Sequence, residues 1–275
     1  MSSAILAFTK SIDTIDLARG TVQLSQAINI APSATERTLR VLSASVSSNI
    51  PNVYTYKDFS NARINISKDN GATWLTVNMP DGVYSIAHIA AAINSAAAVL
   101  TWWTTPSDPG FKLGVNAATD FVYLKIDSTK CIDVGAQLQI DFGSASAAHL
   151  LLGFTDPSVF TVDGLYAASN AAQMDWFGNR VQVLVEGFGS LSYKNADQSY
   201  EICSIPLSSS AINNEYLFPM EGTVSPAIHC DVPNCVRSYS VTFIGSRRNS
   251  DGSPRYVFIY DGDISLYMEL GFKGP

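Results

Sequence analysis

The segment from Lys68 to Leu100 constrains the fold of this chain more than any other part of the sequence. It contains two turn dipeptides, Asn70-Gly71 and Asp81-Gly82, which bracket a short run of nine residues. Asn-Gly supplies the two positive φ values that a type I′ hairpin turn needs. The residues before it alternate through Ile64 and Ile66. The sequence therefore predicts a β-hairpin, with strands over 62–67 and 74–79.

The same segment then predicts the one substantial helix of the chain, beginning after Ser85. The Ser85 hydroxyl is suited to accept hydrogen bonds from the first free N–H groups of a helix. The apolar residues that follow recur at spacings of three and four, which is typical of a helix with one buried face. The predicted buried face consists of Ile86, Ile89, Ala90, Ile93 and Ala97, and most of the remaining surface is alanine.

The rest of the chain is dominated by short apolar runs separated by turn residues, which predicts strands. They lie over 21–30, 38–46, 111–115, 121–126, 136–142, 181–186, 199–205, 237–244, 255–259 and 264–272. So many strands favour an all-β fold, an antiparallel β-sandwich whose sheets close as jelly rolls or barrels.

We predict two jelly-roll-like modules, with the Ala-rich helix inserted in the first. The expected organisation is an N-terminal arm over 1–20 and a first jelly-roll-like domain over 21–160. A linker over 161–180, rich in Asp, Gly, Ser, Asn and Ala, then leads to a second β-sandwich domain over 181–275.

Composition limits the partners of the protein. Only 15% of the residues are charged, against about 25% in ordinary proteins, so we expect other protein to cover part of the surface. An ordinary sandwich with a neutral polar surface is the alternative. The net charge of -7 opposes broad or sequence-specific nucleic-acid binding. The one tight basic pair, Arg247-Arg248, lies beside a turn and is interpreted as a solvated hairpin end.

Cysteine and hydropathy patterns indicate the compartment. No window reaches the ~18–20 apolar residues that span a bilayer, and the N-terminus lacks the pattern of a secretory signal. No membrane span is therefore expected. The four cysteines, at positions 131, 203, 230 and 235, show no dense framework spacing and are expected to be reduced thiols. Cytosolic synthesis fits these features.

A search for catalytic or metal-binding residues predicts no reaction. Four residues separate Cys230 from Cys235, whereas the usual zinc knuckle has two residues between its cysteines. Neighbouring His229 and Cys230 would point in opposite directions in an extended segment. No histidine lies beside a recognisable nucleophile motif. We therefore expect a protein that is not an enzyme, with no catalytic residues, no metal site and no cofactor.

Several motifs resemble a known family. These are the run Leu39–Val46, the run Trp74–Ile86 with its Pro80-Asp81-Gly82-Val83-Tyr84-Ser85 turn, and Leu150–Phe154. The C-terminal runs Tyr239–Phe243, Tyr256–Tyr260 and Ile264–Phe272 add to the pattern. Together they resemble minor capsid proteins of Polinton-like viruses, virophages and related small eukaryotic double-stranded DNA viruses. The segment Ile50–Tyr56 departs from the aromatic-rich, Asn-containing segment that is usual there.

The resemblance implies a jelly-roll structural protein of an icosahedral shell, made in the host cytoplasm or nucleus and located in the virion capsid. It would form the vertices as a penton or cement capsomers as part of a triplex. Its partners would be copies of itself, another minor capsid protein and the major capsid protein. We predict that exposed aromatics lie at the contacts, namely Tyr54, Tyr56, Trp102 and Trp103.

Two other functions stay open on the residues alone. Jelly rolls also serve as carbohydrate-binding or host-attachment modules, and aromatic platforms bind sugars. An enzyme built on a β-sandwich would need converging acids, which the sequence does not display.

Overall fold

The structure is a computed structural model in which the chain forms two compact units. It describes residues 2–56, 59–116, 118–119, 121–142, 147–155, 159–188, 201–207, 215–218, 227–230, 234–249 and 251–274. The first unit comprises Met1–Ile50 and Phe177–Pro275, and the second comprises Pro51–Trp176. We call them the jelly-roll unit, for the reason given below, and the inserted unit, because the second interrupts the first in the sequence.

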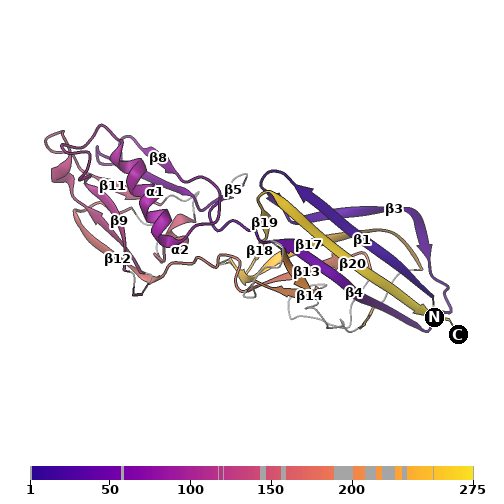
Figure 1. Ribbon diagram of the computed structural model, residues 1–275. Helices are drawn as coiled ribbons and strands as arrows, with labels where there is room; N and C mark the ends of the chain where they lie inside the picture. The colour runs from indigo at the N-terminus through magenta and orange to yellow at the C-terminus, as the bar shows by residue number, and fades with distance from the viewer. Residues whose placement is uncertain are drawn as a thin grey trace. The chain divides into compact units, whose positions relative to one another are not determined.

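One sheet of the jelly-roll unit contains both ends of the chain (Figure 1). Its order is β1-β20-β4-β15, and β16 also pairs with β4 on the side of β15. All pairs are antiparallel, and β1 and β20 keep one register from Ser2↔Phe272 to Ile12↔Gly262. The bounds are β1 (Ser2–Ile12), β4 (Glu36–Ser47), β15 (Glu215–Phe218), β16 (Ile228–His229) and β20 (Gly262–Lys273).

The second sheet of this unit has the order β14-β13-β17-β18, with β3 paired to β17 as well. These pairs are also antiparallel. The bounds are β3 (Arg19–Asn29), β13 (Arg180–Glu186), β14 (Glu201–Pro206), β17 (Cys235–Arg248) and β18 (Pro254–Tyr256). The short strands β2 (Asp16–Leu17) and β19 (Phe258–Ile259) pair with each other.

This connectivity is that of a jelly roll. In chain order the principal strands β1, β3, β4, β13, β14, β15, β17 and β20 divide four and four between the two antiparallel sheets. Two such sheets with Greek-key connections define the fold. Apolar side chains from both sheets fill the space between them, since Leu266, Met268, Val183 and Phe243 are all fully buried. The predicted antiparallel β-sandwich is confirmed.

The division of the chain differs from the predicted domains. Residues 1–20, expected as an arm, include β1, in which Leu6, Phe8 and Ile12 are buried. Residues 21–50 belong with 177–275, because β4 pairs with β20 along ten residue positions and draws the two chain ends into one sheet. The expected linker over 161–180 contains a paired strand, β12 (Gly164–Ala171).

The inserted unit has short antiparallel sheets around the long helix. Their orders are β12-β10-β9, β11-β7-β8 and β5-β6, and α1 contacts β9 and β8. Within the described residues, no helix is long and apolar enough to cross a membrane. The remaining bounds are β5 (Thr55–Tyr56), β6 (Phe59–Ser60), β7 (Arg63–Ser67), β8 (Leu75–Asn78), α1 (Ile86–Ala98), β9 (Phe111–Asn116), β10 (Phe121–Ile126), η1 (Ser128–Lys130), β11 (Gln139–Asp141) and α2 (Ala148–Leu151).

The hairpin and the helix of the inserted unit confirm the local predictions. Asn70 and Gly71 have φ values of 59° and 81°, although their turn lies within a seven-residue connection rather than joining the strands directly. The hydroxyl of Ser85 accepts a hydrogen bond from the His88 N–H at 3.3 Å and caps α1. The buried residues of α1 are the five predicted ones.

Two side chains attach α1 to its surroundings. Asn94 donates to the Leu113 carbonyl at 2.7 Å and accepts from the Leu113 N–H at 2.8 Å. This pair satisfies main-chain groups on the outer edge of β9, which an edge strand otherwise leaves free. The Trp103 indole donates to the Ala97 carbonyl at 2.6 Å, near the last turn of the helix. The helix is thus fixed along its length and at its end.

Candidate subunit interfaces

Two of the four predicted interface aromatics are interior residues, so their expected exposure is wrong. Tyr54 is 3% exposed, and its hydroxyl accepts a hydrogen bond from the Trp176 indole at 3.1 Å. Trp103 is also 3% exposed, and its indole N–H donates a hydrogen bond to the Ala97 carbonyl. A buried Tyr or Trp usually finds a partner for its polar atom. Both side chains serve the core of the inserted unit.

The other two aromatics, Trp102 and Tyr56, are half-buried. Trp102 packs edge-on against Trp103, with ring centroids 6.0 Å apart, and the Lys68 ammonium lies 5.8 Å from its ring centroid. Tyr56 lies in the β5–β6 hairpin, near the start of the unit, whereas Trp102 follows the end of α1. The structure does not bring the four aromatics into one patch.

The strongest candidate interface is the outer face of the sheet β1-β20-β4-β15, which we call the neutral face. Each of the four strands presents one large exposed apolar residue, at exposures of 36–62%. Around them lie mostly small uncharged side chains, because Thr9, Ser265 and Ser45 follow each other across the sheet. The four apolar residues are Ile5, Leu42, Leu217 and Tyr267.

Charge is scarce on the neutral face. Between the rows that contain Ile5 and Thr9, the described charged side chains are Arg40 and Glu269, which pair across β4 and β20 at 4.0 Å. The Ser45 and Ser265 hydroxyls bond to each other at 2.8 Å. Covering this face therefore removes little unpaired polar surface from water. Such burial is inexpensive compared with burying isolated charges.

The opposite sheet of the same unit has a more highly charged outer face. Arg19 and Arg180 are exposed there, and Gln182 donates to the Glu201 carboxylate at 2.7 Å. Arg19 also lies 6.0 Å from the ring centroid of Tyr256, which is 41% exposed. The two outer faces are thus built for different surroundings, and the charged one resembles an ordinary water-exposed sheet face.

Metal chemistry finds no support in the described part of the chain. No group of three or more His, Cys, Asp or Glu side chains among the described residues could hold a metal ion. Cys230 and Cys203 are buried, and burial raises the pKa of the Cys203 thiol.

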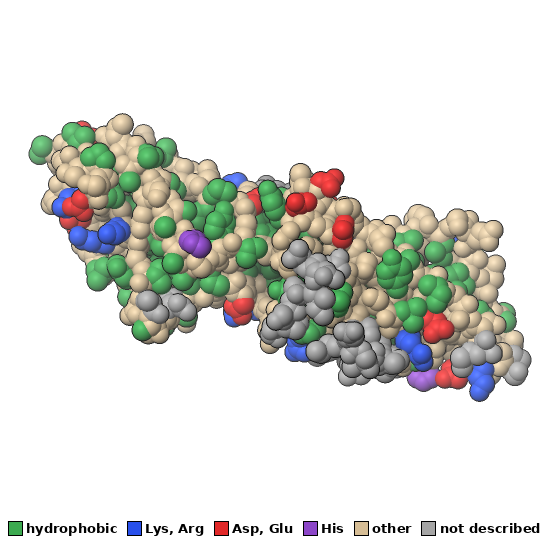
Figure 2. Space-filling model, in the orientation of Figure 1, with side chains coloured by type: hydrophobic (Ala, Val, Ile, Leu, Met, Phe, Trp, Pro, Cys, Tyr) green, Lys and Arg blue, Asp and Glu red, His purple; other side chains and the backbone are tan. Residues whose placement is uncertain are grey.

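Figure 2 shows one face of the molecule, on which charged side chains are sparse among hydrophobic and uncharged polar ones.

Signals for the neutral face existed in the sequence only in part. The alternation of small polar and apolar residues in 264–272 predicts a strand, whereas residues 1–20 predict only an arm, although they contain β1. Its partner β20 lies more than two hundred residues away in the chain, so no local pattern places Ile5 opposite Glu269 or Ala7 opposite Tyr267.

The solved structures that the chain is similar to include two of similar extent. No family model and no curated protein matches the chain. The selenomethionine-labelled penton protein of mavirus is 10% identical, with a TM-score of 0.44, over 99% of this chain and 100% of that chain. A chain from the 3.5 Å cryo-electron microscopy structure of the Sputnik virophage is 12% identical, with a TM-score of 0.40, over 97% of each chain.

Proposed function

We propose that this protein is a structural minor capsid protein of an icosahedral double-stranded DNA virus. It forms the vertices as a penton or cements capsomers as part of a triplex. Its partners are copies of itself or another minor capsid protein, together with the major capsid protein. The observation that carries the proposal is the neutral face of the jelly-roll unit, combined with the motifs that resemble virophage-type capsid proteins.

The energetics of the neutral face suit assembly through many weak contacts. Full burial of a large apolar side chain stabilises by about 1.5–3 kcal/mol, and the four apolar residues are 36–62% exposed. Covering them contributes about 3–5 kcal/mol in total. Association costs at least ~4 kcal/mol in lost freedom. One such contact is therefore weak, whereas a closed ring, in which every subunit makes two contacts, is stable.

The test is the assembly state of the full-length chain, measured by size-exclusion chromatography with light scattering over a range of concentrations. We expect discrete oligomers whose population increases with protein concentration. Tyr267→Lys places a charge in the middle of the neutral face and is expected to shift the protein to monomer. Tyr256→Lys is the matched control, because Tyr256 is 41% exposed and Tyr267 is 39% exposed, on opposite outer faces.

The outcomes separate the proposal from its rivals. A chain that stays monomeric at every concentration, alone and with the major capsid protein, contradicts the proposal. If Tyr267→Lys and Tyr256→Lys change the oligomeric state equally, the neutral face is not the assembly surface. Density for the chain at fivefold positions of a particle identifies a penton, and density at local threefold positions identifies a triplex component. Saturable binding on a glycan array would instead favour the carbohydrate-binding alternative. Tyr54 and Trp103 are buried and so cannot serve as aromatic platforms for a sugar.

A further inference from the structure

A second surface lies at one end of the inserted unit. Strand and helix directions place the connections 68–74, 99–110 and 127–138 at the same end, where β7, α1 and β10 finish (Figure 1). The chain enters this unit at Pro51 and leaves it at Trp176, and both residues lie at the opposite end. We call the three connections together the loop end.

The main chain of the loop end is largely satisfied from within. The Ile132 N–H donates to the Trp102 carbonyl at 2.8 Å, and the Gln137 N–H donates to the Lys68 carbonyl at 3.1 Å. The Asn70 N–H donates to the Gln137 carbonyl at 3.2 Å. Each bond joins two different connections. The loop end is therefore a cross-linked surface that can lose water without leaving these groups unpaired.

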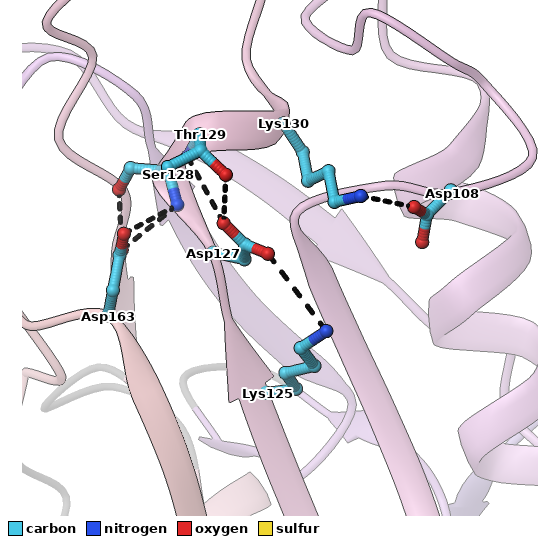
Figure 3. Close-up of polar contacts among 7 residues, drawn as sticks. All are labelled: Asp108, Lys125, Asp127, Ser128, Thr129, Lys130 and Asp163. Atoms are coloured by element: carbon cyan, nitrogen blue, oxygen red, sulfur yellow. Dashed lines mark hydrogen bonds and ion pairs between the residues drawn. The ribbon is translucent and has the colours of Figure 1, made fainter.

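The three connections of the loop end contain four aspartates and two lysines, and both lysines are paired. Lys68 pairs with Asp133 at 2.6 Å, and Lys130 pairs with Asp108 at 2.6 Å. Figure 3 shows the second of these pairs and also shows Asp163 accepting from Ser128, with its oxygens 2.7–2.9 Å from the Ser128 hydroxyl and N–H. No unpaired lysine is therefore left in these connections to attract an anionic partner.

Exposed apolar side chains lie beside these pairs. Val134 is 105% exposed at the second position of a turn, in which the Ala136 N–H donates to the Asp133 carbonyl at 3.1 Å. Val99 and Ile132 are 79% and 57% exposed. Trp74 is 41% exposed, and Trp102 is half-buried. Aliphatic residues at turn tips with tryptophans beside them are the composition of a surface that enters the interfacial zone of a lipid bilayer.

We propose that the loop end docks shallowly on an uncharged, zwitterionic lipid surface. Val99, Ile132 and Val134 enter the boundary between headgroups and acyl chains, while the tryptophans lie at headgroup level. Anionic lipid is not favoured, because the described aspartates outnumber the lysines at this end. A protein groove is less suited, because the most exposed side chains stand at separate turn tips. The proposal concerns the inserted unit and goes beyond the assembly function.

The probe is a phosphatidylcholine vesicle, mixed with the full-length chain and floated on a density gradient. All four tryptophans lie within the inserted unit, at positions 74, 102, 103 and 176. Their emission therefore reports on that unit alone. We expect the protein to float with the vesicles, its emission to shift to shorter wavelength, and brominated acyl chains to quench it. Adding phosphatidylserine should not strengthen binding.

The variants make the location testable. Val99→Asp and Val134→Asp are each expected to weaken vesicle binding by about tenfold or more, since each removes roughly one buried aliphatic side chain and introduces a charge. Val83→Asp is the matched control, because Val83 is 66% exposed near the opposite end of the same unit. Unchanged circular dichroism shows that each variant is folded.

Failure takes distinct forms. No flotation of the native chain, or an equal loss in Val83→Asp and Val134→Asp, overturns the proposal. Binding that requires phosphatidylserine overturns it as well. A loop-end variant that instead loses capture of a capsid subunit identifies a protein contact and also overturns it. The assembly function is measured separately by the oligomeric state, so either proposal can fail alone.

Discussion

Replacing Asn61 with alanine should make the inserted unit unfold at a lower temperature and a lower urea concentration. Asn61 is fully buried and lies two residues before β7. Its side-chain oxygen accepts from the Tyr54 N–H at 2.8 Å, and its amide donates to the Asn52 carbonyl at 2.7 Å. Alanine removes both partners and leaves a buried N–H and a buried C=O without these bonds.

The magnitude follows from those two groups. Leaving one buried polar group unsatisfied costs about 1–3 kcal/mol, so the pair costs about 2–6 kcal/mol. At roughly 4 °C per kcal/mol for a unit of this size, the Tm should fall by about 8–24 °C. Tryptophan emission is the assay, because all four tryptophans belong to the inserted unit. Urea titration gives the free energy of unfolding independently.

Asn65→Ala is the control. The Asn65 side chain is also a strand amide with a hydrogen bond, from the Thr76 hydroxyl at 2.8 Å, but that bond is exposed to solvent. Water replaces it, so we expect a loss of no more than about 0.5–1 kcal/mol. The reasoning is refuted if Asn61→Ala and Asn65→Ala lower stability equally, or if Asn61→Ala leaves the transition unchanged.

Three further predictions concern other parts of the chain. Tyr239→Phe should destabilise the jelly-roll unit by about 1 kcal/mol in urea titration, because the hydroxyl donates to a β1 carbonyl at 2.6 Å. Native-state alkylation followed by mass spectrometry should label exposed Cys235 first, whereas Cys203 is buried with a raised thiol pKa. Hydrogen bonds from Thr73 hold the pKa of Asp69 at about 2, so the stability this carboxylate provides is present above its unfolded pKa and lost as the pH falls toward 2. Thr73→Val should raise the Asp69 pKa measured by NMR, and an unchanged value would contradict this account.

Local features of the fold could be predicted from the sequence. The buried face of α1 follows from spacing alone, and Ser85 caps the helix because serine at that position accepts from the first turn. The positive φ values of Asn70 and Gly71 follow from residue type in the same way. Each of these depends on neighbours within a few positions in the chain.

The missed features depend on distant partners. β1 has only three deeply buried residues in eleven, a pattern too sparse to identify without β20 beside it. Trp103 is buried rather than exposed where its segment pairs with that of Cys131, more than twenty residues further along the chain. Likewise Tyr54 is enclosed with Trp176, which lies more than a hundred residues further along the chain. Burial is set by tertiary packing, and an aromatic residue alone does not report it.

The connection between β4 and β13 explains how one chain can present two independent surfaces. A jelly roll closes through pairs such as β1-β20 and β13-β17, which do not involve that connection. A long insertion there costs little in loop entropy, because the cost grows only with the logarithm of length. The loop end is formed from the connections of the inserted unit and the neutral face from strands of the jelly-roll unit, so they share no residue. Variants in the two surfaces should therefore act additively. The double variant of Val134 and Tyr267 is measured by both vesicle flotation and oligomeric state. If its loss in each assay is only the sum of the two single-variant losses, the surfaces are independent, and strong non-additivity contradicts that independence.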